Sequence, residues 1–365
     1  AGASALTAHG SEVVSLALAG GGTALASAGR DEAVRVWRVD RDGVPTTYAV
    51  LRPQRAVDRV ALGEDGRWLA GSSGRGLHMW DLEAIEREPV ELIGHAEAIR
   101  ALQFAGSGWL VSLDLTGEIH FWRMTPAGPE PSSRRTSLPH GVWALAASDE
   151  HMAVGTGSSD GAAGRTYVWP LGEPWGEAAR IAEHSRPVTA LAFSADGRLV
   201  ASGSADGGVR TAIRGEERWR AGRPYDHGQS VRALAFARDS GVLAIGGADG
   251  GIALHEPEAG GEPRRFVAHT SAITGLAFGT DRGRLISAGQ DGALTSWRIG
   301  DGEAPWASPL VGHRGPIFEL LADREGRVVV TAGDDATVRV WPLEPAGLVR
   351  LACMAVGRDL APDVW

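Results

Sequence analysis

A hairpin-like phrase recurs along this chain and constrains its fold more than any other feature. It reads VVVTAGDDATVRVW over Val328–Trp341, and close copies span Leu25–Trp37 and Leu285–Trp297. Each copy has apolar and β-branched residues, a turn that contains Gly and Asp, and an alternating run that ends in Trp. That order is typical of two strands joined by a tight turn. We therefore expect an array of similar units rather than unrelated domains.

Three copies keep four residues at identical spacing. In each of them the His stands 28 residues before the Trp, the hydroxyl residue four before the Asp, and the Asp six before the Trp. The three sets are His9, Ser27, Asp31 and Trp37; His269, Ser287, Asp291 and Trp297; and His313, Thr331, Asp335 and Trp341. Three sets with one spacing cannot be a coincidence of composition.

Five weaker copies fill the gaps between these three. One has His95, Ser112 and Trp122, with Thr116 in the Asp place, and another has His140, Thr156, Asp160 and Trp169, with three extra residues after the Asp. A third has His184, Ser202 and Asp206, with Ala212 in the Trp place, and a fourth has His227 and Asp249, with Ile245 in the hydroxyl place and His255 in the Trp place. The fifth keeps only Trp80, with Gly74 in the Asp place. The chain thus holds eight copies, with successive starts about 42 to 45 residues apart.

The repeats resemble the WD40 family over roughly residues 3 to 343. The resemblance lies in Gly-His pairs (Gly94-His95, Gly312-His313), Asp-Gly turns (Asp206-Gly207, Asp249-Gly250, Asp291-Gly292) and the strand-ending Trp, although only Trp80 is followed by Asp. It implies an all-β propeller of four-stranded blades, since one small sheet cannot bury its own face. Eight copies predict eight blades; seven blades with a degenerate appendage is the alternative. We expect residues of about 3–8 to complete the last blade, so that the propeller spans residues 1–343.

The repeated Ser, His and Asp also raise the hypothesis of a hydrolase. A catalytic site is built once, whereas this combination recurs in several copies. In the family that the repeats resemble, His, hydroxyl, Asp and Trp form a buried hydrogen-bond chain within each blade, and their donor and acceptor capacities fit such a chain. We therefore expect a structural role for the three sets and no enzyme. A hydrolase that uses the atypical copy with Asp160 is the least favoured alternative.

Composition excludes several other classes of function. A net charge of −9 argues against a nucleic-acid-binding protein, which needs a basic stripe to neutralise phosphates. The chain has no Lys, which rules out a phosphate-binding loop of the GxxxxGK[ST] kind. Cys353 is the only cysteine, and His120, His151 and His255 lack metal-ligand spacing, so we expect no metal and no cofactor. No apolar run is long enough to span a membrane, and we expect a cytoplasmic protein.

Partners of the family that the repeats resemble usually bind the face that carries the start of the first strand and the turn before the Asp. The residue after the first core aliphatic of strand one is expected to point to this face: Val14, Asp58, Arg100, Trp143, Thr189, Arg232, Thr274 and Phe318. The residue before the turn Asp joins it at Arg30, Leu115, Ser159, Gln290 and Asp334. We expect partner binding by Arg30, Asp58, Arg100, Trp143, Arg232, Gln290, Phe318 and Asp334, since aromatic and Arg residues contribute most interface energy. The alternative for Trp143 is that it plugs the channel.

The remaining segments lie outside the blades' inner strands. Met124–His140 is expected to be a mobile, proline-rich excursion at a blade edge. Residues 344–365 have helical apolar spacing and are expected to pack on the propeller. This tail resembles the C-terminal segment of WD40 regions in large bacterial proteins that carry an NTPase, protease or kinase domain. The resemblance implies a non-catalytic sensor or regulatory module that binds a protein or peptide, or an effector domain of the same polypeptide. A constitutive scaffold is the alternative.

Overall fold

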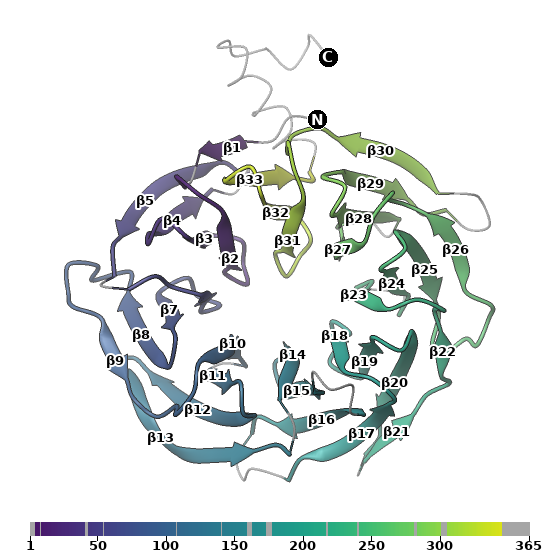
Figure 1. Cartoon of the computed structure of the whole chain (residues 1–365), viewed down its shortest axis with the longest axis horizontal. Helices are drawn as coiled ribbons and strands as arrows, with labels where there is room; N and C mark the ends of the chain where they lie inside the picture. Colours follow the sequence, from purple (N-terminus) through teal and green to yellow (C-terminus); the bar gives the residue numbers. More distant parts are fainter. Residues whose placement is uncertain are drawn as a thin grey trace.

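The residues form a ring of small antiparallel sheets, and the first strands of the sheets, such as β14 (Val142–Ala147) and β31 (Ile317–Ala322), lie nearest the centre (Figure 1). The computed structural model describes residues 4–7, 9–40, 43–53, 55–106, 108–139, 141–158, 163–172, 177–216, 218–238, 241–280, 283–300 and 305–344. Within these ranges the sheets number eight, and no helix is present. The fold is thus an eight-bladed β-propeller, which confirms the predicted fold class and the count of eight. The predicted C-terminal helix lies outside the described residues.

We number the sheets as blades one to eight in chain order. Blade one holds β2 (Val13–Leu18), β3 (Ala24–Gly29), β4 (Val34–Val39) and β5 (Pro45–Leu51); blade two β6 (Arg59–Leu62), β7 (Trp68–Ser73), β8 (Gly76–Asp81) and β9 (Val90–Leu92). Blade three holds β10 (Ile99–Ala105), β11 (Trp109–Asp114), β12 (Glu118–Thr125) and β13 (Gly128–Ser137); blade four β14 (Val142–Ala147), β15 (His151–Thr156), β16 (Gly164–Pro170) and β17 (Ala179–His184). The strands of each blade pair in sequence order.

The second half of the ring follows the same plan. Blade five holds β18 (Val188–Phe193), β19 (Leu199–Ser204), β20 (Gly208–Arg214) and an outer strand in two pieces, β21 (Trp219–Ala221) and β22 (Tyr225–Asp226); blade six β23 (Val231–Phe236), β24 (Leu243–Gly247), β25 (Gly251–His255) and β26 (Arg264–Val267). Blade seven holds β27 (Ile273–Phe278), β28 (Arg284–Gly289), β29 (Leu294–Arg298) and β30 (Trp306–Leu310); blade eight β31 (Ile317–Ala322), β32 (Val328–Gly333), β33 (Thr337–Pro342) and β1 (Ser4–Thr7).

The core lies between neighbouring blades rather than at the centre of the ring. One cluster joins Leu16 and Trp37 of blade one to Val330 and Val340 of blade eight. Every residue of the second strands β3 and β32 is buried, because the two faces of each blade are covered by its two neighbours. The outer strands are exposed instead, as in β30. Each blade therefore depends on its two neighbours for most of its apolar burial.

The first strand in the sequence belongs to the last blade. β1 pairs antiparallel with β33, with Ser4 opposite Val340 and Thr7 opposite Thr337, and Leu6 packs against the cluster shared by blades eight and one. This pairing joins the two ends of the ring. The division into a propeller over residues 1–343 and a tail over 344–365 stays a prediction, because most of the tail lies outside the described residues.

The segment Met124–His140 differs from its expected form. It was expected to be a mobile excursion at a blade edge, but residues 128–137 form β13, the outer strand of blade three. The register shifts between Phe121 and Arg123 on the partner strand, so a bulge accommodates the two prolines in this stretch. An outer strand tolerates proline because only one of its edges has to pair.

Candidate functional site

Hydrogen-bond chains run through blades seven and eight at the predicted positions. In blade seven, the Trp297 indole donates to Ser287 Oγ over 2.8 Å, Ser287 Oγ lies 2.7 Å from His269 Nε2, and His269 Nδ1 lies 2.9 Å from Asp291. In blade eight the corresponding distances through Trp341, Thr331, His313 and Asp335 are 2.9, 2.7 and 3.0 Å. The indole can only donate and the carboxylate can only accept, which fixes the direction of each chain. Each chain fastens the loop before strand one to the turn between strands two and three.

Blades one and three have variants of this chain. In blade one, His9 lies 2.7 Å from both Asp31 and Ser27, and Arg35 adds an ion pair to Asp31 at 2.9 Å. Blade three was expected to lack the acid, because Thr116 occupies its place. Asp114, two residues earlier, supplies the carboxylate at 3.2 Å from His95 and also accepts a hydrogen bond from the Thr116 hydroxyl. The acid is thus displaced along the turn rather than lost.

The remaining blades have incomplete chains in the described residues. His184, the last residue of β17, bonds Ser202 of blade five at 2.9 Å, but its other nitrogen lies 3.7 Å from Asp206. In blade six, neither ring nitrogen of His227 has a hydrogen-bond partner. In blade two, the buried hydroxyl of Ser72 has none either. His140 and Asp160 of blade four lie outside the described residues.

The pKa values of the buried His and Asp side chains predict that the free energy of unfolding of this chain decreases as the pH is lowered. Burial lowers the pKa of His184 to about 4, so unfolded chains bind a proton between pH 6.5 and 4 that the folded state excludes. Burial alone would raise the pKa of Asp335, but hydrogen bonds from Thr337 and His313 outweigh it and lower the pKa to about 2, which acts in the same direction below pH 4. Because His184 is protonated only in the unfolded chain over this range, we expect this residue alone to lower the free energy of unfolding by about 3 kcal/mol as the pH falls from 7 to 4.

Urea unfolding of the native chain and of His184→Gln at several pH values measures this term. The variant should lose less stability than the native chain between pH 6.5 and 4, because Gln does not titrate. Parallel pH profiles for the two proteins would contradict the assignment to His184.

A β-bulge near the start of strand one turns one residue per blade out of the ladder. The register shifts between Ile99 and Ala101 in β10, and the same shift recurs in the first strands of every blade except blade two. The bulged residues are Val14, Arg100, Trp143, Thr189, Arg232, Thr274 and Phe318, the positions expected to face a partner. A bulge re-aims the side chain that it carries. Asp58 is exposed at the corresponding position of blade two.

The residues before the turn Asp lie beside these bulges. The backbone N–H of Gln290 donates to Ala272 O, and that of Asp334 donates to Pro316 O, just ahead of the first strand in each blade. Arg30 and Leu115 are held in the same way. Both sets of side chains therefore project from one face of the ring, which we call the upper face. Ser159 lies outside the described residues.

The structure brings together some of these residues and separates others. The Arg100 guanidinium lies 5.2 Å from the ring centroid of Trp143, within the range of a cation–π contact. Arg59, which the sequence did not single out, donates to the carbonyl oxygens of Asp58 and Arg100 and so links blades two and three. We call Asp58, Arg59, Arg100, Leu115 and Trp143 the mouth patch. The other expected residues, Arg30, Arg232, Gln290, Phe318 and Asp334, are exposed on blades one, six, seven and eight.

Trp143 borders two hollows of the upper face. One is the channel, with a volume of about 830 Å³. The other has about 470 Å³ and lies between Arg100, Leu115, Pro139 and Trp143. Trp143 remains 39% exposed and Leu115 51% exposed, so the tryptophan lines the channel without being buried in it. The apolar surface at the mouth is thus open to a partner.

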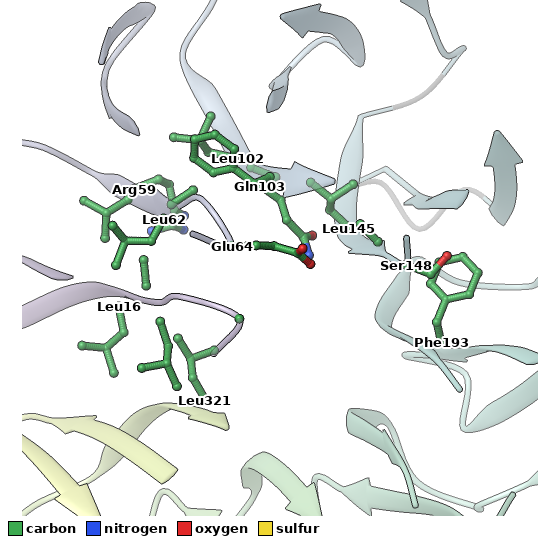
Figure 2. Close-up of a pocket in the computed structure, with 18 of the residues that line it drawn as sticks. Leu16, Arg59, Leu62, Glu64, Leu102, Gln103, Leu145, Ser148, Phe193 and Leu321 are labelled. Atoms are coloured by element: carbon green, nitrogen blue, oxygen red, sulfur yellow. The ribbon is translucent and has the colours of Figure 1, made fainter. Parts of the chain in front are cut away.

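The channel wall combines apolar side chains with a few charged groups (Figure 2). Leu16, Leu102 and Leu321 contribute apolar surface, and Arg59 and Glu319 lie among them. The carboxylate of Glu319 accepts a hydrogen bond from the backbone N–H of Leu16 over 2.8 Å. Desolvation raises the pKa of this half-buried carboxyl group to about 7. A ligand in the channel would therefore meet an acid that titrates near neutral pH.

An ion-pair network crosses the opposite end of the channel. Arg324 of blade eight pairs with Asp149 of blade four and lies 3.5 Å from Glu64 of blade two. Blades four and eight face each other across the ring, as their first strands β14 and β31 show in Figure 1. These side chains are about half exposed, so the pairs contribute little stability. They narrow the channel at this end, and the mouth patch borders its other end.

The blades thus form a closed ring, and exposed aromatic and Arg side chains lie on one of its faces. The family described as WD domain, G-beta repeat matches residues 3–38, 177–211, 260–298 and 307–342, which hold most of the inner strands of blades one, five, seven and eight. The chain therefore carries WD40 repeats, and WD40 propellers are generally non-catalytic protein-interaction modules. No helix in the described residues is long and apolar enough to cross a membrane.

Several known proteins are similar to this chain. It is 29% identical to Protein ROOT INITIATION DEFECTIVE 3 of Arabidopsis thaliana over 39% of this chain, and 22% identical to Target of rapamycin complex subunit wat1 of Schizosaccharomyces pombe over 50%. The matches span 32% and 56% of those relatives' lengths. The computationally designed Ika8 protein (TM-score 0.72, 25% identity) and Saccharomyces cerevisiae Sqt1 (0.73, 15%) share the fold over 93% of this chain and 98% of theirs.

Proposed function

We propose that the upper face binds a protein or peptide at the mouth patch. The observation that carries this proposal is Trp143, which stays 39% exposed between two hollows while Arg100 packs against its ring. Trp and Arg at the centre of a concave, rigid surface are the residue types that contribute most to interface energy. Arg232 of blade six and Phe318 of blade eight are exposed on the same face and would extend the contact with the partner.

The structural role of the hydrogen-bond chains favours a non-catalytic function. Ser287 and Thr331 are fully buried, and each is already bonded to a His and a Trp, so neither hydroxyl is placed to attack a substrate. The net charge of −9 disfavours nucleic acid as the partner. We infer a cytoplasmic recognition domain in a larger signalling or defence protein, with an effector domain of the same polypeptide as a second candidate partner. The resemblance of the tail to bacterial multidomain proteins supports this role.

A constitutive scaffold is the second candidate function. One similar protein is named as a subunit of the target of rapamycin complex, which favours complex assembly over sensing. A sensor should lose an activation response when its mouth patch is changed, whereas a scaffold should lose co-purification of a stable complex.

A pull-down from the source organism tests the binding site. Trp143→Ala/Arg232→Ala/Phe318→Ala should recover less than about a tenth of the partner that the native chain binds. Trp306→Ala is the matched control, because this tryptophan is 73% exposed on the outer strand β30, away from the mouth. Equal recovery by the triple variant and the control, at equal melting temperature, would move the binding site off the upper face.

A further inference from the structure

Three side chains of blade three come together in the manner of metal ligands. His95 precedes β10, whereas Glu118 and His120 lie two residues apart on β12. One possible ligand atom from each, a ring nitrogen or a carboxylate oxygen, lies within 4.8 Å of the other two. Among the described residues this is the one group of three or more His, Cys, Asp or Glu side chains that converge in this way.

The buried His120 side chain has a ring nitrogen that forms no hydrogen bond with the protein. It is only 6% exposed, and its Nε2 has no hydrogen-bond partner. Glu118 Oε1 lies 3.2 Å from this nitrogen, yet the two atoms are not aligned as a hydrogen bond. Two ligands of one tetrahedral zinc ion, each about 2.0–2.1 Å from it, stand about 3.3 Å apart. The 3.2 Å between Glu118 Oε1 and His120 Nε2 thus suits two atoms that bind one metal ion.

The His95 side chain lies close enough to join them. Its ring centroid lies 4.2 Å from that of His120. The His95–Asp114 distance of 3.2 Å is longer than the shortest His–Asp distances of 2.7, 2.9 and 3.0 Å in blades one, seven and eight. This bond is therefore the one most easily exchanged for another partner.

The other blades show that the fold does not require these residues. On the third strand of each blade, one residue lies opposite the buried Ser or Thr of the second strand. This residue is His120 in blade three, but Arg35 in blade one, Thr295 in blade seven and Arg339 in blade eight. The position of Glu118 is held by Ala33 in blade one and Ala293 in blade seven. Gly94 makes room for His120, since a Cβ there would lie 2.7 Å from its ring.

We propose that His95, Glu118 and His120 bind a divalent transition metal ion, with Zn²⁺ as the best match to two imidazoles and one carboxylate. The bound ion would join the loop before β10 to β12 and fix the corner of the upper face next to Arg100. This site was not expected from the sequence, which predicted no metal. It is independent of the proposed partner binding.

Titration of the purified, chelator-treated full chain with Zn²⁺ by calorimetry tests the site, with Co²⁺ absorption as a second readout. We expect one Zn²⁺ per chain, a higher melting temperature with Zn²⁺, and Co²⁺ bands of a four-coordinate site. His120→Arg and Glu118→Ala copy residues that blades one and seven already accept, so both should fold. His120→Arg should weaken Zn²⁺ binding by at least about 100-fold.

The repeat also permits a gain-of-function test in another blade. Ala268→Gly/Ala293→Glu/Thr295→His would place the same pair beside His269 in blade seven, with a glycine in the place of Gly94, and should create a second Zn²⁺ site. Absence of Zn²⁺ binding by the native chain would overturn the proposal and favour a simple ion pair between His120 and Glu118. Binding that survives His120→Arg at full affinity would overturn it as well, because the ion would then be held elsewhere.

Discussion

Replacement of Trp341 by alanine should destabilise the propeller by about 3–5 kcal/mol. Trp341 is 2% exposed and packs in the cluster between blades seven and eight. Its indole also donates to Thr331, which would lose a hydrogen bond inside the blade. The cost thus combines a large cavity with a buried hydroxyl that loses one of its two partners and keeps only His313.

Urea unfolding at pH 7 measures this loss as a lower midpoint. Trp306→Ala serves as the control, because its side chain is 73% exposed and its removal should change the free energy of unfolding by less than about 0.5 kcal/mol. Trp341→Phe fills much of the cavity but cannot donate, so it should fall between the two. An equal midpoint for Trp341→Ala and Trp306→Ala would show that the chain of hydrogen bonds is not part of a stable core.

Deletion of residues 1–7 should open the ring and cost at least about 3 kcal/mol. The deletion removes β1, its ladder with β33 and the packing of Leu6, while His9 stays in place. The exposed edge of β33 would then be free to pair with another chain. We expect a lower melting temperature and association that increases with protein concentration.

Calorimetry and light scattering of the truncated chain check both effects. A peptide of residues 1–8 in excess should restore part of the lost stability by mass action. A truncated chain that stays monomeric with an unchanged melting temperature would show that β1 does not hold the ring closed.

The repeat made the architecture predictable from the sequence. Identical spacing in three copies predicted the His, hydroxyl and Asp residues that bond one another in blades one, seven and eight, and eight copies led to eight blades. The positions that carry the bulges were named from the sequence as residues expected to face a partner, because each follows the first apolar residue of a first strand, but the bulges themselves were not predicted. Blade three was misread because Asp114 reaches the His95 ring from a turn position two residues before the expected one.

The contacts across the ring could not be foreseen. Arg324 and Asp149 are 175 residues apart, and only the closure of the ring brings their loops together. Arg59 becomes part of the mouth patch because it bonds the neighbouring blade, which no local pattern indicates. The three residues of the proposed metal site escaped notice for a similar reason, since a 23-residue gap separates His95 from Glu118 and the fold brings them together. The spacing of nearby residues predicts the strands and turns of one blade. Contacts between residues far apart in the sequence depend on how the blades twist and pack, which this spacing does not indicate.

The strand order has a consequence for how this protein can be divided or enlarged. Each sequence repeat supplies the outer strand of one blade and the three inner strands of the next, as residues 307–342 do with β30 of blade seven and β31 to β33 of blade eight. A cut between repeats therefore leaves each fragment with a free outer strand at its start and a three-stranded blade at its end, so the two ends match. A cut between blades instead leaves β1 unpaired in one fragment and blade eight without its outer strand in the other. Duplication of one whole repeat would insert a blade without disturbing any neighbour's pairing, so gene duplication could vary the ring size while every blade stays four-stranded.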